Sequence, residues 1–466
     1  MKKIILGFGC LLGLLVAVTV PAAEIKVKDG DSIQAAVKKA QPGDTILVYP
    51  GTYNESVYID KDSITVRGVI EEGEWPTLDG EKKLNDAVLY SGNNITIEQL
   101  KIIRYKGNAI MGQAGNNYVI RHNWVIDTGV YGIFPQFGEN GLIEYNVLSG
   151  IEDAAIYVGM CDHVDVRHNE VFNNVAGIEI ENTRHAIVEN NYVHNNTGGI
   201  LTFITPGLPI KTTYDVIIRN NFVVNNNTPN FGVEGSLVSK VPAGTGIIVM
   251  AGDDVVIEGN IISGNNTAGI VITDLTFVTD IASDPDSEPN PDRIKILRNF
   301  MVNNGAEPVA AVRALALTHF TTKGPDVLAD GSAKDKARGS CIVDNNSYRT
   351  FGLRHWGECD ATATTAAIRS HRLDKPVPAR KITNDADRVE KLYNGICAGC
   401  HAYNVRMVGP PTQVIQAIHR NNPQAIADYI AKPVKKRPDY PEMPPQDHLS
   451  AEIRFKVAEH MLKLEK

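Results

Sequence analysis

Short segments of alternating apolar and polar residues recur along the first three quarters of the chain, and each ends in an asparagine. The alternation has the period of two that is typical of half-buried β-strands. Spacings between the asparagines are 22 or 23 residues at first and 30 or 39 later, which predicts one β-solenoid coil per repeat, with loop insertions in the longer coils. These asparagines are Asn123, Asn146, Asn169, Asn191, Asn221, Asn260 and Asn299.

A structural role explains the repeated asparagines. Asparagine tolerates the left-handed backbone of a solenoid corner, and stacked amides pass hydrogen bonds from one coil to the next. A second set follows four or five residues after the first, as the pairs that begin at Asn173, Asn195, Asn225, Asn265 and Asn303. We therefore expect two structural ladders and no catalytic role for these side chains.

The start of the repeat region predicts a capped solenoid. Residues 31–40 have a helical apolar pattern that begins at Asp31 or Ser32 and ends before Pro42, and a helix there would cover the first coil. Residues 43–68 resemble the opening of right-handed parallel β-helix proteins of the pectate-lyase and periplasmic copper-maturation type. That resemblance implies a mainly β fold, a right-handed parallel β-helix over residues 24–360, and says little about activity.

One sheet face of this solenoid carries candidate chemistry. If isoleucines such as Ile156 and Ile178 point inward, strand alternation sends Tyr157, Glu179 and Glu181 outward beside apolar neighbours. Such a strip predicts either a ligand site or a surface covered by an inserted loop. The inserted loops next to it are residues 205–214 and 227–244.

Tyr157, Glu179 and Glu181 are the catalytic candidates, with Asp153 and His168 as further acid or base candidates. The segment from Tyr131 to Gln136 is similar to the mannuronan epimerase motif, in which an Asp and a His flank the proline. Phe134 and Gln136 stand in those two places, so the sequence argues against epimerase activity. The repeats also resemble secreted bacterial β-helix proteins of unassigned function, which are often encoded alongside c-type cytochromes.

The strongest chemical motif lies near the C-terminus, in the sequence Cys-Ala-Gly-Cys-His. Cys397 and Cys400 have the spacing that attaches the two vinyl groups of haem, and His401 follows as an iron ligand. This motif predicts one covalent haem c. Of the two methionines that compete for the other axial position, Met443 is far enough along the chain to pass under the haem, whereas Met407 is only six residues from His401.

Residues 385–466 resemble the small, all-α bacterial class I cytochromes c, through CAGCHA, RMVGPP, EMPPQ and a closing amphipathic helix from Ala451 to Leu464. The resemblance implies His401 and Met443 as axial iron ligands and a Pro410 carbonyl that orients His401. It also implies electron transfer with a redox partner protein, such as another cytochrome.

Composition and charge narrow the function classes. The 466 residues are 43% hydrophobic, which excludes a disordered polymer, and they exceed the usual size of one core. The net charge is −8. A net-negative chain lacks the basic surface that binds nucleic-acid phosphates, so the sequence argues against nucleic-acid binding. The low aromatic content of 7% suits a narrow core of stacked isoleucine, valine and leucine.

The chain ends and joins complete the prediction. Residues 1–22 have basic residues first, then an apolar run, and then small residues typical of a signal-peptide cleavage site. This pattern predicts a signal peptide, and therefore a periplasmic or secreted protein without a membrane span in the mature chain. Residues 361–384 predict a linker that leaves the two domains mobile. Cys341 and Cys359 are candidates for a disulfide, and Cys161 for a buried thiol.

The sequence thus favours a secreted monohaem c-type cytochrome that carries single electrons, with a β-helix that binds a partner or a polysaccharide. The alternative is a polysaccharide-modifying enzyme of the lyase, epimerase or oxidase type. In that case the β-helix holds the active site and the haem is an electron outlet.

Overall fold

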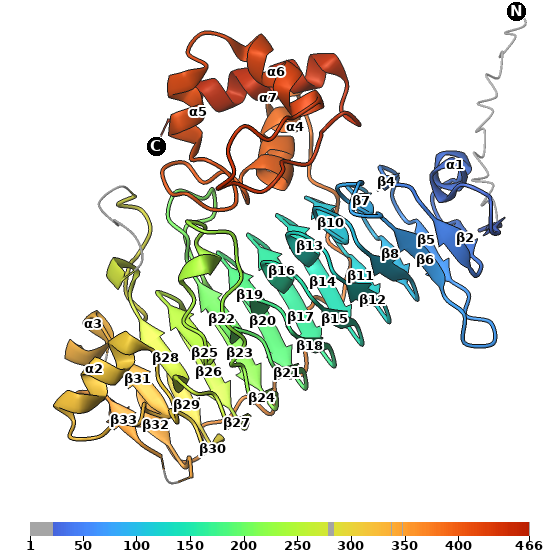
Figure 1. The fold of residues 1–466 in the computed structure, drawn as a ribbon. Coiled ribbons are helices and arrows are strands. Elements are labelled where there is room, and N and C mark those ends of the chain that lie inside the picture. The colour runs from blue at the N-terminus through green and yellow to red at the C-terminus, as the bar shows by residue number, and fades with distance from the viewer. Residues whose placement is uncertain (1–21, 278–283, 337, 347, 466) are drawn as a thin grey trace, which may run out of the picture.

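A computed structural model describes residues 22–277, 284–336, 338–346 and 348–465. Residues 1–21 of the predicted signal peptide lie outside the described part. The described chain forms a parallel β-helix with three sheets, followed by several C-terminal helices that lie over one face of the solenoid (Figure 1). Among the described residues, no helix combines the length and hydrophobicity that crossing a bilayer requires.

Most coils contribute one strand to each of three parallel sheets, here named A, B and C, and coils at the ends of the solenoid lack some of these strands. Within each sheet, the strands are given in chain order. Sheet A contains β1 (Glu24–Val27), β2 (Thr45–Val48), β5 (Thr65–Gly68), β8 (Thr96–Glu98), β11 (Val119–Arg121), β14 (Glu139–Glu144), β17 (Asp162–Arg167), β20 (Arg184–Glu189), β23 (Tyr214–Arg219), β26 (Asp253–Glu258), β29 (Lys295–Leu297), β32 (Cys341–Val343) and β34 (Gly357–Glu358). Sheet B contains β3 (Gly51–Tyr53), β6 (Pro76–Asp79), β9 (Lys101–Ile103), β12 (Trp124–Ile126), β15 (Val147–Ser149), β18 (Glu170–Phe172), β21 (Tyr192–His194), β24 (Phe222–Val224), β27 (Ile261–Ser263) and β30 (Phe300–Val302). Sheet C contains β4 (Val57–Ile59), β7 (Val88–Tyr90), β10 (Ile110–Gln113), β13 (Tyr131–Gln136), β16 (Ala154–Gly159), β19 (Ala176–Glu181), β22 (Gly198–Phe203), β25 (Thr245–Met250), β28 (Ala268–Thr273), β31 (Val327–Ala329) and β33 (Thr350–Phe351).

The predicted capping helix is confirmed as α1 (Ile33–Lys39). The Ser32 hydroxyl caps it by accepting a hydrogen bond from the Ala35 amide, and Ile33 and Val37 are buried against the first coils. Short helices also occur in the solenoid's later loops: η1 (Val238–Lys240), η2 (Leu275–Phe277), α2 (Ala310–Thr318) and α3 (Ser332–Asp335).

Both asparagine ladders are confirmed. In the first, the Asn191 amide donates to the side-chain oxygen of Asn221 at 3.0 Å and accepts from Asn169 at 3.0 Å, and the same pattern runs from Asn123 to Asn345. The second ladder runs from Asn174 through Asn196, Asn226 and Asn265 to Asn304. The buried amides satisfy one another along the axis, which fixes the register of the coils.

The cysteines of the solenoid lie as the sequence predicted. A disulfide joins Cys341 and Cys359 near the C-terminal end of the β-helix. Cys161 is a buried free thiol.

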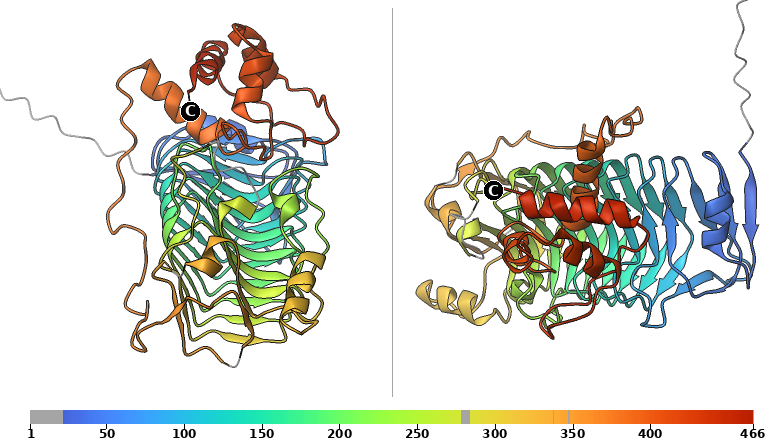
Figure 2. Two further views of the ribbon diagram at one scale, coloured as in Figure 1. Left: turned by 90° about the vertical axis from the view of Figure 1, so that its left-hand side faces the viewer. Right: turned by 90° about the horizontal axis from the view of Figure 1, so that it is seen from above.

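The C-terminal helices are α4 (Asp385–Leu392), the turn η4 (Tyr393–Cys397), α5 (Thr412–Ile418), α6 (Pro423–Ala431) and α7 (Ala451–Lys463). The predicted closing helix is therefore present as α7. Figure 2 shows these helices gathered along the side of the solenoid. They share an apolar cluster with Met160 and Leu208 of the β-helix, so the two parts pack directly on each other.

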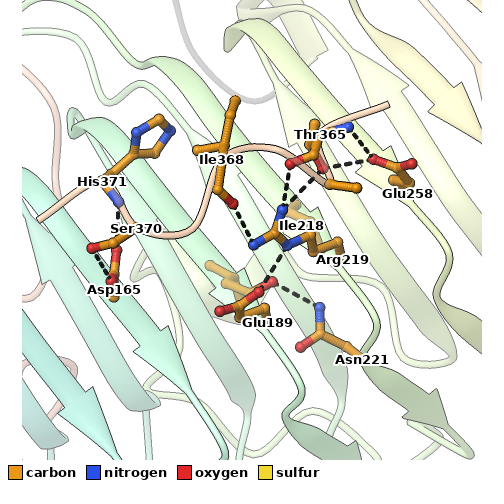
Figure 3. A network of polar contacts seen from close by, with 12 residues as sticks. Asp165, Glu189, Ile218, Arg219, Asn221, Glu258, Thr365, Ile368, Ser370 and His371 are labelled. Atoms are coloured by element: carbon orange, nitrogen blue, oxygen red, sulfur yellow. Dashed lines mark hydrogen bonds and ion pairs between the residues drawn. The ribbon is translucent and has the colours of Figure 1, made fainter. Parts of the chain in front are cut away.

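The segment 361–384 is not the free linker that its composition predicted, because it is hydrogen-bonded along sheet A (Figure 3). The Thr365 amide donates to Glu258 at 2.7 Å, and the Ser370 hydroxyl donates to Asp165 at 2.6 Å. Arg219 donates to the carbonyls of Thr365 and Ile368 at 2.7 and 2.8 Å. These contacts hold the segment against consecutive coils, and so guide the chain back from the end of the solenoid to its middle.

A candidate active site under the C-terminal helices

The predicted register of sheet C is confirmed, and its outward-pointing side chains are covered, which was one of the two predictions for this strip. Ile156 pairs with Ile178 inside the solenoid, and Tyr157 pairs with Glu179 on its outer side. Yet Tyr157, Glu179 and Glu181 are only 1%, 3% and 1% exposed. The C-terminal helices and the inserted loop 227–244 cover this face, which strand alternation alone does not reveal.

A cavity of about 250 Å³ remains between sheet C and its cover. Its polar wall includes Tyr131, Asp153, Tyr157, Glu179 and Glu181, and further polar residues of the lining are Lys240, Asp330 and three threonines. Most of the remaining wall is apolar and includes Leu201, Phe203, Val238, Met250, Met407 and Val408. Loop cover and ligand site were competing predictions: the cover is confirmed, and the loop supplies part of the wall of a cavity, so a ligand site there stays a prediction.

Burial controls the charge of the cavity carboxyls. It raises the pKa of Asp153 to about 8 and that of Glu181 to about 8, and for Glu181 the nearby Asp153 adds to the effect. Burial, together with Asp153, also raises the pKa of Glu179 well above its ordinary value. Each shift favours the protonated form of its carboxyl, which is the form that donates hydrogen bonds or acts as a general acid.

Two polar atoms of this wall have no hydrogen-bond partner among the described residues. They are Oε2 of Glu181 and the hydroxyl of Tyr157, both buried. The other oxygen of Glu181 accepts from the Thr205 hydroxyl. Tyr131 stacks on Tyr157 with ring centroids 4.4 Å apart, which holds the Tyr157 ring in place. Unpaired buried polar atoms beside a cavity are groups that a bound ligand can satisfy.

The other solenoid candidates lie in different surroundings. Phe134 packs edge-on against Tyr157 as a buried aromatic, and the Gln136 amide donates to the Asn394 carbonyl of the C-terminal region. The two residues that depart from the epimerase motif thus serve packing and docking. His168 lies at a corner after sheet A, stacked on Tyr145 at 4.8 Å, and does not line the cavity.

The Cys-Ala-Gly-Cys-His motif adjoins the same face of sheet C. A Cβ at Gly399 would lie 2.1 Å from the Gln136 side-chain oxygen, so a larger residue there would force the Gln136 side chain to move. Burial raises the pKa of the Cys397 and Cys400 thiols to about 12, and for Cys400 the effects of Asp153 and Glu181 contribute. Thiols held protonated are poor nucleophiles, so the pair does not suit disulfide exchange.

His401 is 9% exposed and oriented by the predicted contact with Pro410. Nδ1 of His401 and the Pro410 carbonyl are 2.8 Å apart, and because a carbonyl only accepts, Nδ1 carries the proton and Nε2 the lone pair. Burial lowers the pKa of the ring and favours this neutral form. A Cβ at Gly409 would lie 2.3 Å from the ring, so the backbone presses closely on it.

The two methionines lie in different places. Met443 is half-buried in the apolar cluster that contains Cys397, Ala398 and Ala402. Met407 belongs to that cluster too, but it also lines the sheet C cavity. The Cys397 thiol and the Met443 thioether share this apolar cluster, and Cys400 and His401 follow Cys397 in the chain. These groups are of the kinds that could hold a covalently attached haem.

Comparison with known proteins supports the solenoid. The family model "Right handed beta helix region" matches residues 83–205 and 163–280. No curated protein matches the chain in sequence.

Similar solved structures include two mannuronan C-5 epimerase A-modules of Azotobacter vinelandii. The AlgE6 module is 14% identical with a TM-score of 0.48, covering 67% of this chain and 79% of that chain. The AlgE4 module is 16% identical with a TM-score of 0.46, covering 73% and 88%. An alginate lyase from Paenibacillus sp. str. FPU-7 is 14% identical with a TM-score of 0.37, covering 72% and 97%.

Proposed function

We propose that this chain is an enzyme that acts on a hydroxyl-rich, carbohydrate-type substrate in the sheet C cavity, with a c-type haem beside that cavity as an electron outlet. One observation carries the proposal: three buried carboxyls and two tyrosines share the wall of one cavity next to the Cys-Ala-Gly-Cys-His motif. The proposal follows the enzyme alternative of the sequence, since a carrier of single electrons has no need for such a cavity.

The wall suits a neutral sugar better than a polyuronate. Protonated carboxyls and phenols donate hydrogen bonds to hydroxyl oxygens, while the apolar wall can face the C–H surface of a sugar ring. A uronate needs cations to neutralise its carboxylate. Lys240 is the one cationic side chain among the described cavity residues, against four acidic ones counting Asp330.

Proton transfer is the chemistry that these carboxyls can supply. Glu179 is the first candidate for the acid, because it lies beside Tyr157 in the sheet register and its pKa is raised by both burial and Asp153. Asp153 and Glu181 flank the same wall. The acidic groups are also close enough to Cys400 to raise its pKa, so the motif and the cavity are neighbours.

In this proposal Cys397 and Cys400 hold the haem, His401 and Met443 ligate its iron, and Pro410 orients His401. Such a haem supplies exchange of one electron at a time. A partner cytochrome as electron acceptor and a periplasmic or secreted location remain predictions from the sequence.

The cavity function is tested with Glu179→Gln in the full, haem-loaded protein. Binding of neutral mono- and oligosaccharides and of uronate oligomers is measured by calorimetry, and turnover by product analysis. We expect a neutral sugar to bind both proteins similarly, and turnover to fall at least about 100-fold in the variant, the usual contribution of a general acid. Glu307→Gln, at an exposed position, is the matched control. Equal turnover in Glu179→Gln and wild type would refute the acid assignment, and no binding of any sugar would favour the electron carrier.

The haem ligands are tested separately, through the thioether-to-iron absorption band of the oxidised protein. Met443→Ala should abolish this band, whereas Met407→Ala should retain it. If the band survives in Met443→Ala, the proposed axial ligand is wrong. A protein without covalent haem after expression with haem-attachment machinery would refute the haem itself.

A further inference from the structure

A second group of chemically active side chains lies on sheet A, away from the cavity. Strands β17, β20 and β23 are neighbours, with Asp162 paired to Arg184 and Arg184 paired to Tyr214. The next residue of each strand, His163, His185 and Asp215, has a positive φ of 51° to 56°. The same backbone turn is therefore repeated in three coils, which stacks these side chains. The rings of His163 and His185 are 4.7 Å apart.

Both imidazoles are held with one nitrogen occupied. Nδ1 of His163 is 2.9 Å from the carbonyl of His371, and Nδ1 of His185 is 2.7 Å from the Asp215 carboxylate. Since carbonyl and carboxylate oxygens only accept, each Nδ1 carries the proton and each Nε2 the lone pair. A carbonyl or a carboxylate behind the imidazole is also the arrangement that orients histidines at metal sites.

A carboxylate oxygen completes the set. Arg184 donates to Oδ2 of Asp162 at 2.8 Å, while Oδ1 is buried without a hydrogen-bond partner among the described residues. One ligand atom from each of Asp162, His163 and His185 lies within 4.8 Å of the others. A cation at the centre of three such atoms would replace the missing partner of Oδ1.

We propose that Asp162, His163 and His185 bind a divalent first-row transition metal, with Zn²⁺ as the probe of choice. Two imidazoles and one carboxylate are donors that Zn²⁺ and its neighbours prefer, whereas Ca²⁺ and Mg²⁺ prefer oxygen alone. Nε2 of His371 is also buried without a hydrogen bond among the described residues. It lies 3.6 Å from Oδ1 of Asp215, and the His371 ring lies 6.0 Å from that of His185. His371 belongs to the segment 361–384, so a metal here would connect that segment to the solenoid (Figure 3).

The full-length protein without a histidine tag, stripped with a chelator and dialysed, is titrated with Zn²⁺ by calorimetry, and bound metal is counted by elemental analysis. We expect about one more equivalent in wild type than in the His163→Ala/His185→Ala double variant. Metal held at the distant Cys-Ala-Gly-Cys-His motif would be equal in both and cancels in this comparison. Asp215→Asn, which replaces the carboxylate behind His185 that also lies 3.6 Å from Nε2 of His371, should weaken binding about 10-fold or more.

His168→Ala is the matched control, because His168 also stacks at a coil corner, on Tyr145. It should retain the metal. A second measurement, proteolysis within residues 361–384, should be slowed by Zn²⁺ in wild type and in His168→Ala, but not in the double variant. Equal metal content in wild type and double variant would overturn the proposal and leave the two histidines as structural rungs. The proposal would also be overturned if Mg²⁺ or Ca²⁺ binds at His163 and His185 and Zn²⁺ does not.

Discussion

Glu181 should make the protein less stable as the pH rises through neutrality, and Glu181→Gln should remove that loss. Burial, reinforced by Asp153, raises the pKa of Glu181 from 4.5 to about 8, although a hydrogen bond from Thr205 acts in the opposite direction. In the unfolded chain the side chain is in water and titrates at its ordinary value. Between these two values the folded protein holds a proton that the unfolded chain has lost.

The size of the effect follows from the pKa difference. One unit corresponds to about 1.4 kcal/mol, so a rise from 4.5 to about 8 corresponds to about 5 kcal/mol. This stabilisation is fully present below the unfolded pKa and is lost as the pH rises through the folded pKa. Glu181 alone should therefore lower the free energy of unfolding by about 1.4 kcal/mol per pH unit between pH 5 and pH 8. Glutamine has a similar shape, keeps a partner for the Thr205 hydroxyl and does not titrate.

Urea unfolding, followed by circular dichroism at pH 5, 6, 7 and 8, gives the free energy of unfolding against pH for wild type and for Glu181→Gln. The profile of Glu181→Gln should be flatter than that of wild type by about 1.4 kcal/mol per pH unit. Glu307→Gln, whose side chain is exposed, should leave the wild-type slope unchanged. Parallel profiles for wild type and Glu181→Gln would show that the Glu181 carboxyl is ionised in the folded protein, and would remove the basis for a protonated carboxyl wall.

Two further predictions concern stability. Asn191→Ala should lower the free energy of unfolding by about 3–5 kcal/mol, since it removes the side-chain oxygen that accepts from both amide groups of Asn169, backbone and side chain, and one of the two donors to the Asn221 side-chain oxygen. Urea unfolding checks this, and a loss below about 1 kcal/mol would contradict the ladder's role. Replacing Cys341 and Cys359 by serine should cost about 3 kcal/mol, as expected for a cross-link over 18 residues, and reduced wild type should match the variant in the same assay.

Much of the fold was predictable from local patterns. A strand period of two and an asparagine in every coil specify a parallel β-solenoid, because each coil can bury its apolar face only on its neighbours. The inward position of Ile178, the outward position of Glu179 and both amide ladders followed from this repeat. The capping helix followed from its own apolar pattern and its serine cap.

The sequence by itself thus determined the solenoid, its register, its ladders and the presence of the Cys-Ala-Gly-Cys-His motif. Only the tertiary structure decided that the C-terminal helices lie on sheet C, that residues 361–384 are bound along sheet A, and that Glu179 and Glu181 are buried in a cavity wall. The physical reason is how far apart along the chain the interacting residues lie. Alternation is set by neighbouring residues, whereas Met407 reaches the cavity, and His371 reaches His163, through contacts between segments separated by 200 residues or more. The charge of the carboxyls depends on that same burial, which no local pattern contains.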